Sequence, residues 1–311
     1  MNLAAIDIGT NTVLLLIASV DDAGRITPLA YEQRIPRLGK GVDASRTLQQ
    51  EAMNRVVDVL KEYQGLVAGF AIEAIVVCGT SAVRDAANRD DLAARIKAHT
   101  DWDLETLDGE QEALWSYRGA ISGVPEADRA TVVDIGGGST EIIVGNRRAI
   151  KQKVSLNVGS VRLTERFFRH DPPTHPELEA AIEMVEDELS RAGQFEFSGS
   201  RLIGVAGTAT SLAVLAQGVQ EFDVRAVTNY RMTTDSVNSL FRTLRGMPSG
   251  LILNLSPVMA GRADVIVAGS LILREVMEHF RFDEVTVSER GVRYGLVMRE
   301  WERRRPGGTT A

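Results

Sequence analysis

Two acidic side chains flank a run of three glycines in the stretch Thr131 to Gly145, which reads TVVDIGGGSTEIIVG. An apolar run ends in Asp134, the glycines and two hydroxyl residues follow, and Glu141 opens a second apolar run. Because glycines tolerate positive φ and lack a Cβ, their N–H groups can converge on an anion. A hard divalent cation would bridge the two carboxylates to phosphate oxygens. The stretch predicts a phosphate-binding turn between two strands; a glycine hairpin without a ligand is the alternative.

The same pattern begins the chain, where the residues from Ala4 to Ile17 read AAIDIGTNTVLLLI. Aligning the two aspartates pairs Asp7 with Asp134, Ile8 with Ile135, Gly9 with Gly136 and Thr12 with Ser139. The two copies indicate a duplicated fold in which two phosphate loops face each other across a cleft. Neither copy is a common nucleotide motif, because the sequence has no G-x-x-x-x-G-K-[ST] and no G-x-G-x-x-G between a strand and a helix. The expected phosphate contacts of the two turns are Thr10, Asn11, Thr12, Gly136, Gly137, Gly138 and Ser139, and the expected metal ligands are Asp7, Asp134 and Glu141.

The composition of the 311-residue chain narrows the possible functions. With 44% hydrophobic and 25% charged residues it is typical of a soluble globular protein, and its length suits two domains. The formal net charge of −7 argues against sequence-independent binding of nucleic acid, which needs a broad basic face. We therefore expect a polyanionic substrate to be held by local arginines.

The sequence gives no signal for export or membrane insertion. The apolar run Val13 to Val20 lacks the basic flank of a signal peptide and is too short to span a bilayer. The single cysteine, Cys78, excludes an internal disulfide and a CxxC metal site, and we expect it in the core. A cytoplasmic protein with no nucleic-acid or membrane partner is expected.

Apolar periodicity predicts the elements that must position these side chains. Strands are expected at 26–35, 72–77, 104–107, 131–134, 142–144 and 285–288. One further strand is expected to end with residues 154–158, and another to begin at 201. Helices are expected at 47–63, 90–98, 177–191, 211–216, 232–244 and 265–277, with others that begin near 109 and 160 and a terminal helix after 295.

Further candidates follow the strands of the first half. Ser81 and Arg84 follow the strand expected at 72–77, and ligands in open α/β sheets collect at the carboxyl ends of such strands. Asp108 and Gln111 have the spacing of a capping box, which places Glu112 in the first turn of a helix. Acidic residues are favoured there by the helix macrodipole alone, so the spacing of Glu112 also has a purely structural explanation.

The remaining candidates are small residues at strand ends and isolated arginines. Ser160 opens a helix whose N–H groups are expected to face the cleft. Gly207 and Thr208 follow the strand that starts at 201. Arg37, after the third strand, lines a phosphate path or decorates an exposed loop, and Arg162 and Arg290 are further candidates for a basic lining.

Taken in order, these motifs resemble the exopolyphosphatase and guanosine pentaphosphate phosphohydrolase family, which belongs to the actin-like superfamily. The motifs that carry the resemblance are Asp7 to Thr12, Thr80 to Arg84, Gly109 to Ala113, Asp134 to Glu141, Gly204 to Thr210 and Ser288 to Gly295. The resemblance implies an α/β fold of two duplicated actin-like (ribonuclease H-like) domains, each a mixed β-sheet flanked by helices, with the active site in the interdomain cleft. The expected domains are 1–124, rejoined by the terminal helix 296–311, and 125–295. The chain is similar to the short form, without the helical C-terminal domains of longer members.

The resemblance also implies a chemistry. Glu112 matches the general base in the family's G-x-x-E-A motif, and Asp134 and Glu141 match the acidic residues that organise Mg²⁺ (or Mn²⁺) and the attacking water. We expect hydrolysis of the terminal phosphate of inorganic polyphosphate by a homodimer. Guanosine pentaphosphate is the alternative substrate; an ATP-dependent sugar kinase or actin-like ATPase, and a non-catalytic polyphosphate or alarmone sensor, are the alternative functions.

Overall fold

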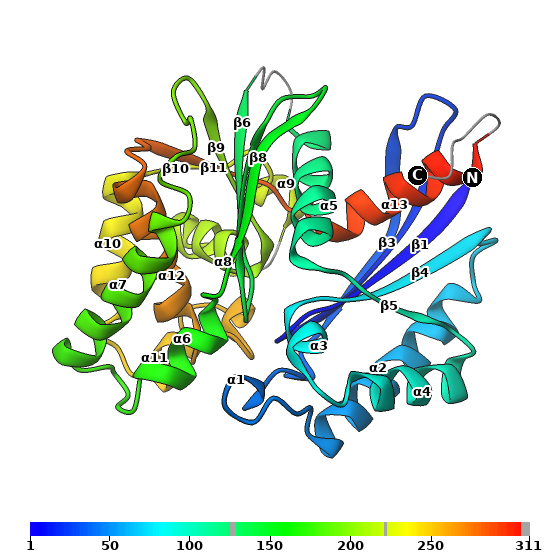
Figure 1. The fold of residues 1–311 in the computed structure, drawn as a ribbon, viewed down its shortest axis with the longest axis horizontal. Coiled ribbons are helices and arrows are strands. Elements are labelled where there is room, and N and C mark those ends of the chain that lie inside the picture. Colours follow the sequence, from blue (N-terminus) through cyan, green and yellow to red (C-terminus); the bar gives the residue numbers. More distant parts are fainter. Residues whose placement is uncertain (125–128, 221–222, 306–311) are drawn as a thin grey trace. The chain divides into compact units, whose positions relative to one another are not determined.

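The structure, a computed structural model, describes residues 1–124, 129–220 and 223–305 (Figure 1). Two compact units are distinguished by their internal contacts: Met1–Gly119 together with the chain from Val292 onward, and Ala120–Gly291. The boundary between them falls within helix α5 (Gly109–Ser122). The expected domain boundary at 124/125 and the last six residues of the expected terminal helix lie at or beyond the limits of the described residues.

The first unit is built on a five-stranded sheet with the order β3-β2-β1-β4-β5. Strand β1 contributes side chains to the hydrophobic clusters on both faces of this sheet, because successive side chains of a strand point to opposite faces. Ala4, Ile6 and Ile8 pack with helices α2 and α4 on one face, and Leu3 and Ala5 pack with helix α13 on the other. Its elements are β1 (Asn2–Ile8), β2 (Val13–Val20), β3 (Ile26–Arg34), α1 (Val42–Ser45), α2 (Gln50–Val67), β4 (Ala74–Gly79), α3 (Ser81–Asp85), α4 (Arg89–Thr100), β5 (Leu104–Thr106), most of α5, and α13 (Val292–Arg304).

The second unit is built on a six-stranded sheet with the order β10-β11-β9-β6-β7-β8. Its largest hydrophobic cluster joins β6, β7 and β9 to helices α7, α8, α10 and α12. Its elements are β6 (Ala130–Ile135), β7 (Thr140–Gly145), β8 (Ile150–Leu156), α6 (Ser160–Phe167), α7 (His175–Ser190), β9 (Arg201–Val205), α8 (Ala206–Gln217), α9 (Val224–Val227), β10 (Arg231–Thr233), α10 (Thr234–Leu244), α11 (Ser249–Leu253), a 3₁₀ turn (Pro257–Met259), α12 (Ile266–His279) and β11 (Glu284–Val287).

The two sheets repeat one topology. The order β3-β2-β1-β4-β5 recurs as β8-β7-β6-β9-β11, with the same antiparallel and parallel pairings. The Gly9 N–H donates to Thr12 O at 2.8 Å, and the Gly136 N–H donates to Ser139 O at 3.0 Å. The duplication and the pairing of positions predicted from the sequence are therefore confirmed at the level of single hydrogen bonds.

Several segments differ from the expectations, and the sequence did not predict the short helices α1, α3, α9 and α11. The helix expected at 232–244 begins at Thr234, because Arg231–Thr233 pairs with β11 as the edge strand β10. Helix α8 begins at Ala206, five positions before the expected start. Cys78 is fully buried, as expected. Within the described ranges, every helix is too short or too polar to cross a membrane.

Candidate active site

The turn between β6 and β7 is anchored by its carbonyl groups. The Gly136 carbonyl accepts a hydrogen bond from the Ser160 N–H at 2.9 Å, and the Gly137 carbonyl accepts one from the Val161 N–H at 2.8 Å. The N–H groups at the start of α6 are thus engaged by the turn. This differs from the expectation that they would be offered to a ligand, since each donor already has a carbonyl partner.

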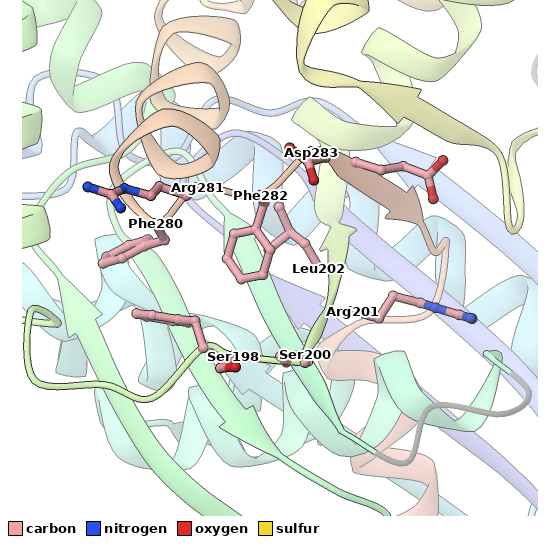
Figure 2. Close-up of a pocket in the computed structure, with 11 residues that line it drawn as sticks. Ser198, Ser200, Arg201, Leu202, Phe280, Arg281, Phe282 and Asp283 are labelled. Atoms are coloured by element: carbon pink, nitrogen blue, oxygen red, sulfur yellow. The ribbon is translucent and has the colours of Figure 1, made fainter.

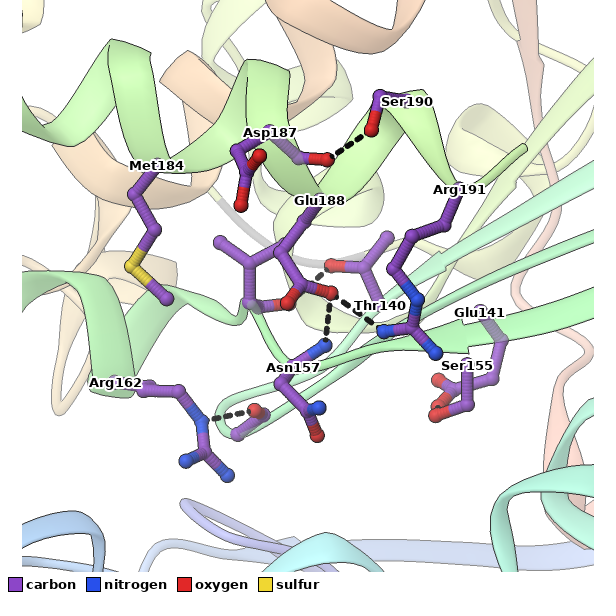
Figure 3. Close-up of polar contacts among 12 residues, drawn as sticks. Thr140, Glu141, Ser155, Asn157, Arg162, Met184, Asp187, Glu188, Ser190 and Arg191 are labelled. Atoms are coloured by element: carbon purple, nitrogen blue, oxygen red, sulfur yellow. Dashed lines mark hydrogen bonds and ion pairs between the residues drawn. The ribbon is translucent and has the colours of Figure 1, made fainter. Parts of the chain in front are cut away.

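The third carbonyl of the turn is held by a side chain. The Nε of Arg162 donates to Gly138 O at 2.6 Å, and the arginine is buried (Figure 3). The backbone of the turn also packs tightly on Gly159, where a Cβ would come within 2.6 Å of the Gly137 carbonyl carbon. Only glycine permits this approach of α6 to the turn.

The direction of these carbonyls fixes the direction of the turn's N–H groups. A trans peptide places its C=O and N–H on opposite sides of the chain. Because three successive carbonyls point toward α6, the N–H groups of Gly137, Gly138 and Ser139 point away from it. No acceptor in the described part of the chain contacts these three N–H groups. Successive N–H groups that point to the same side of the chain can bind an anion together.

Two carboxylates flank the turn. Asp134 and Glu141 are direct partners across the β6–β7 ladder, so their side chains project from the same face of the sheet. They are 6% and 1% exposed, and the Ser155 hydroxyl donates to Glu141 Oε1 at 2.7 Å (Figure 3). Like charges directly opposite each other are destabilising, and a cation would offset that repulsion.

This donor set fits a hard divalent cation. The residues described here include no group of three or more His, Cys, Asp or Glu side chains that could hold a metal alone. Mg²⁺ commonly uses one or two protein carboxylates and takes its other ligands from phosphate and water. Asp134 and Glu141 match that requirement. Asp7, the third expected ligand, lies in the first unit, half-buried on β1 between Leu14 and Cys78.

The matching turn of the first unit is held in a similar way. The Thr10 carbonyl accepts from the Gly39 N–H at 2.7 Å, and the Asn11 carbonyl accepts from the Arg37 N–H at 3.1 Å. A Cβ on Gly39 would lie 2.3 Å from Thr10 Cγ2, so this contact also requires glycine. The peptide N–H groups of Asn11 and Thr12 consequently point away from the segment that follows β3.

Glu112 lies at the same edge of the first sheet as that turn. The Thr80 N–H bonds Ile8 O at 3.1 Å and the Leu107 N–H bonds Gly79 O at 2.9 Å, which brings the carboxyl ends of β1, β4 and β5 together. Glu112 is 7% exposed. A carboxylate with so little solvent access needs charged or hydrogen-bonded partners.

Arg84 supplies one such partner. Its Nη1 donates to Glu112 Oε2 at 2.7 Å and to the Leu107 carbonyl at 3.1 Å. Arg84 therefore contacts the candidate base, whereas the sequence suggested a direct role in phosphate binding. Ser81, at the start of α3, is buried.

A family model matches residues 16–304, nearly the whole chain, and its description is the Ppx/GppA phosphatase family. The chain belongs to this family. The resemblance drawn from the motifs is thereby confirmed, and as a member of the Ppx/GppA family the protein is a phosphoanhydride hydrolase.

Individual relatives cover most of the chain. Exopolyphosphatase 2 of Mycobacterium tuberculosis is 36% identical over 95% of this chain and 97% of that protein. The bifunctional 3-dehydroquinate synthase/phosphatase of Fusobacterium nucleatum is 34% identical, but this chain spans only 46% of its length. The guanosine-5'-triphosphate,3'-diphosphate pyrophosphatase of Photobacterium profundum is 28% identical, and the chain spans 58% of it.

Solved structures support the same fold. The crystal structure of an exopolyphosphatase from Cytophaga hutchinsonii matches with a TM-score of 0.88 and 30% identity, over 96% of each chain. The family member from Aquifex aeolicus matches with a TM-score of 0.83 and 32% identity, over 98% of this chain and 99% of that one. The expected actin-like fold of two mixed sheets flanked by helices is therefore confirmed.

Three candidate residues of this Ppx/GppA protein contact other parts of the protein. Thr208 is buried, and its hydroxyl donates to the Ile135 carbonyl at 3.5 Å. Gly207 lies under Arg262, whose Nη1 would be 1.4 Å from a Cβ at that position. The contact of Arg262 with Gly207 was not predicted, because no motif or spacing distinguishes this arginine, which lies four positions before α12. Arg290, near the C-terminal end of β11, donates through Nη1 to the Ser122 carbonyl and hydroxyl, each at 3.3 Å.

A hollow of about 340 Å³ lies at the opposite end of the strands of the second sheet (Figure 2). Phe197, Phe280 and Phe282 line it, while Arg201 and Arg281 point to opposite sides. It adjoins the first residues of β9 and β11, whereas the glycine turn follows the last residue of β6, which runs parallel to β9. The hollow is therefore separate from the candidate site of this family member.

Proposed function

We propose that this protein is an exopolyphosphatase that removes the terminal phosphate from inorganic polyphosphate. The observation that carries the proposal is the glycine turn of the second unit, whose three N–H groups point away from the element that holds its carbonyls. Such a turn suits the oxygens of a phosphoryl group, and the relatives named exopolyphosphatase are consistent with a polymer substrate.

In the proposed reaction Glu112 is the general base. Its carboxylate takes a proton from a water molecule, the water oxygen bonds to the terminal phosphorus, and the bridging P–O bond breaks. The products are orthophosphate and a chain that is shorter by one phosphate. Arg84 orients Glu112, and the N–H groups of Gly137, Gly138 and Ser139 stabilise charge on the non-bridging oxygens.

Asp134 and Glu141 would hold Mg²⁺ or Mn²⁺ in this scheme. When bound, the ion would neutralise phosphate charge as that charge develops. We expect Glu141→Ala to require a higher Mg²⁺ concentration for half-maximal activity than the wild-type protein. An unchanged Mg²⁺ titration would remove Glu141 from the metal site.

The test of the main proposal is orthophosphate release from polyphosphate by three proteins. The wild type should be active, and Glu112→Gln should lose about 10²–10⁴ in kcat while still binding the polymer, because it lacks the base. Glu110→Gln is the matched control, since Glu110 is exposed in the same helical turn. Equal activity of the two variants would contradict the role of Glu112.

Guanosine pentaphosphate is the second candidate substrate. The observation that favours it is the 28% identity to the guanosine-5'-triphosphate,3'-diphosphate pyrophosphatase of Photobacterium profundum. Both substrates end in a phosphoanhydride, so the same base and turn serve either reaction. We expect kcat/KM to be higher for polyphosphate when the two are compared side by side. The reverse order would make the guanosine nucleotide the preferred substrate.

A further inference from the structure

We propose that Arg162 is a positioning residue that sets the direction of one peptide group, the one that joins Gly138 to Ser139. It does so by holding the Gly138 carbonyl, so that the Ser139 N–H is turned toward the substrate. This gives Arg162 a different role from the phosphate lining expected from the sequence. The inference rests on the proposed function, because it concerns how the same turn is made ready for phosphate.

The guanidinium is placed for this task. Its Nε donates to Gly138 O at 2.6 Å, and the residue is 6% exposed (Figure 3). A buried, charged donor strengthens a hydrogen bond to a neutral carbonyl. Among the described residues, Arg162 is the one that donates to this carbonyl.

The backbone that carries Arg162 is itself braced. Glu188 of α7 accepts from the Asn157 N–H at 2.9 Å and from Arg191 Nη1 at 2.7 Å (Figure 3). The Thr140 hydroxyl donates to the Val158 carbonyl at 2.6 Å. These hydrogen bonds connect the segment between β8 and α6 to helix α7 and to strand β7. The start of α6 is thus a fixed support from which the side chain reaches the turn.

Comparison of the duplicated halves shows what the side chain replaces. In the first unit the position that matches Gly138 is Asn11, whose carbonyl accepts from the main-chain N–H of Arg37 at 3.1 Å. In the second unit the main-chain donors of α6 reach Gly136 and Gly137 only. The arginine side chain of the second unit therefore does what a main-chain N–H does in the first.

Loss of this donor has a specific consequence. Without a partner the Gly138 carbonyl is free to rotate, and glycine imposes little barrier on its own ψ. Rotation would turn the Ser139 N–H away from the phosphate while Gly137 and Gly138 keep theirs, since the preceding carbonyls stay anchored by α6. Removal of one donor to developing negative charge typically lowers kcat by about 10²–10³.

The test compares two substitutions of equal length. In Arg162→Gln the amide nitrogen lies the same number of bonds from Cα as the arginine Nε, so a donor is kept and the charge is lost. In Arg162→Met a methyl group occupies that position, and both are lost. Arg166→Met, an exposed arginine one turn later on α6, is the control for the chemical change and should match the wild type.

Two readouts are taken on each protein: kcat and KM on polyphosphate, and amide NMR shifts during titration with inorganic phosphate. We expect Arg162→Met to lose about 10²–10³ in kcat with a smaller change in KM, and to lose the phosphate response of Ser139 while Gly137 still responds. Arg162→Gln should stay within about 10-fold of the wild type in kcat and keep the Ser139 response.

Other results would overturn the inference. Equal loss in a folded Arg162→Gln and in Arg162→Met would show that the charge matters, which returns Arg162 to phosphate binding. Wild-type behaviour of Arg162→Met would show that the Gly138 peptide needs no support. Absence of any response in the wild-type turn would remove the proposed phosphate site itself, and the inference with it. If Arg162→Met does not fold, Arg162→Gln still tests the inference, because a loss of about 10²–10³ in its kcat would return Arg162 to phosphate binding.

Discussion

At the scale of single residues, the proposed base of this enzyme has a cation as its near neighbour. Glu112 and Arg84 are 2.7 Å apart, and their side chains are only 10% and 22% exposed. Removing one partner of an ion pair with so little solvent access leaves the other charge poorly compensated. The free-energy cost is therefore larger than for an exposed ion pair. A change at Arg84 is therefore expected to act through the orientation of Glu112.

A double-mutant cycle tests this coupling. Arg84→Ala should lower kcat in the wild-type background, because the carboxylate loses the group that orients it. In the Glu112→Gln background the same change should have a much smaller effect, with a coupling energy of about 0.5–3 kcal/mol. The measurement is orthophosphate release by the four proteins. Independent losses in the two backgrounds would mean that Arg84 contacts the substrate directly.

The types of these residues were predictable from the sequence, but their partners were not. The glycine turns, the carboxylates and Glu112 belong to short-range patterns, so spacing and motif were enough to select them as candidates. The side chain of Arg162 reaches back to Gly138, 24 positions earlier in the chain. Sequence spacing reports which residues share an element, and it does not report the direction in which a long side chain leaves that element.

At the scale of elements, a local signal located the start of α5, whereas a strand that depends on nonlocal pairing was missed. Asp108 and Gln111 form the predicted capping box, with bonds of 3.0 and 2.7 Å between their side chains and N–H groups. Strand β10 was missed because Met232 continues the apolar spacing of Val237 and Phe241 in α10. The strand exists through its pairing with β11, more than 50 positions away, which periodicity does not detect.

The start of α7 gives a prediction for pH. Glu177 accepts hydrogen bonds from the N–H groups of Thr174 and Arg169 and contacts His170, and these contacts lower its pKa to about 2. Its pKa in the unfolded chain is near 4.5, so the folded state favours the charged form. The resulting stability is present above that value and is lost as the pH falls toward 2.

Chemical denaturation at pH 5 and pH 3 measures this contribution. The wild type should lose unfolding free energy between the two pH values, and Glu177→Gln should lose less, because glutamine does not titrate. Glu179→Gln is the control, since Glu179 is exposed two positions later on the same helix. A drop in Glu177→Gln as large as that of the wild type would assign the acid sensitivity to other groups.

At the scale of the whole molecule, the duplication produces two units with separate cores. Every hydrophobic cluster of the described residues belongs to one unit or the other. The chain nevertheless returns to the first unit at its C-terminal end, where α13 covers the face of β1 and β2 that α2 and α4 leave open. The repeated strand order was readable from the two Asp-Ile-Gly motifs. The packing face of α13 was not, because it depends on a sheet formed nearly 300 positions earlier.

Separate cores predict that the two units respond to different substitutions. Leu296 of α13 is fully buried in the first unit, so Leu296→Ala should cost about 2–5 kcal/mol of unfolding free energy. The three tryptophans of the chain, Trp102, Trp115 and Trp301, all lie in that unit, and their fluorescence therefore reports its unfolding.

Leu271→Ala is the matched control, because Leu271 is equally buried in the second unit. In urea we expect the fluorescence midpoint to fall for Leu296→Ala and to stay near the wild-type value for Leu271→Ala, whereas circular dichroism should detect both. Equal falls in fluorescence would show that the two cores unfold as one cooperative system, despite having no hydrophobic cluster in common among the described residues.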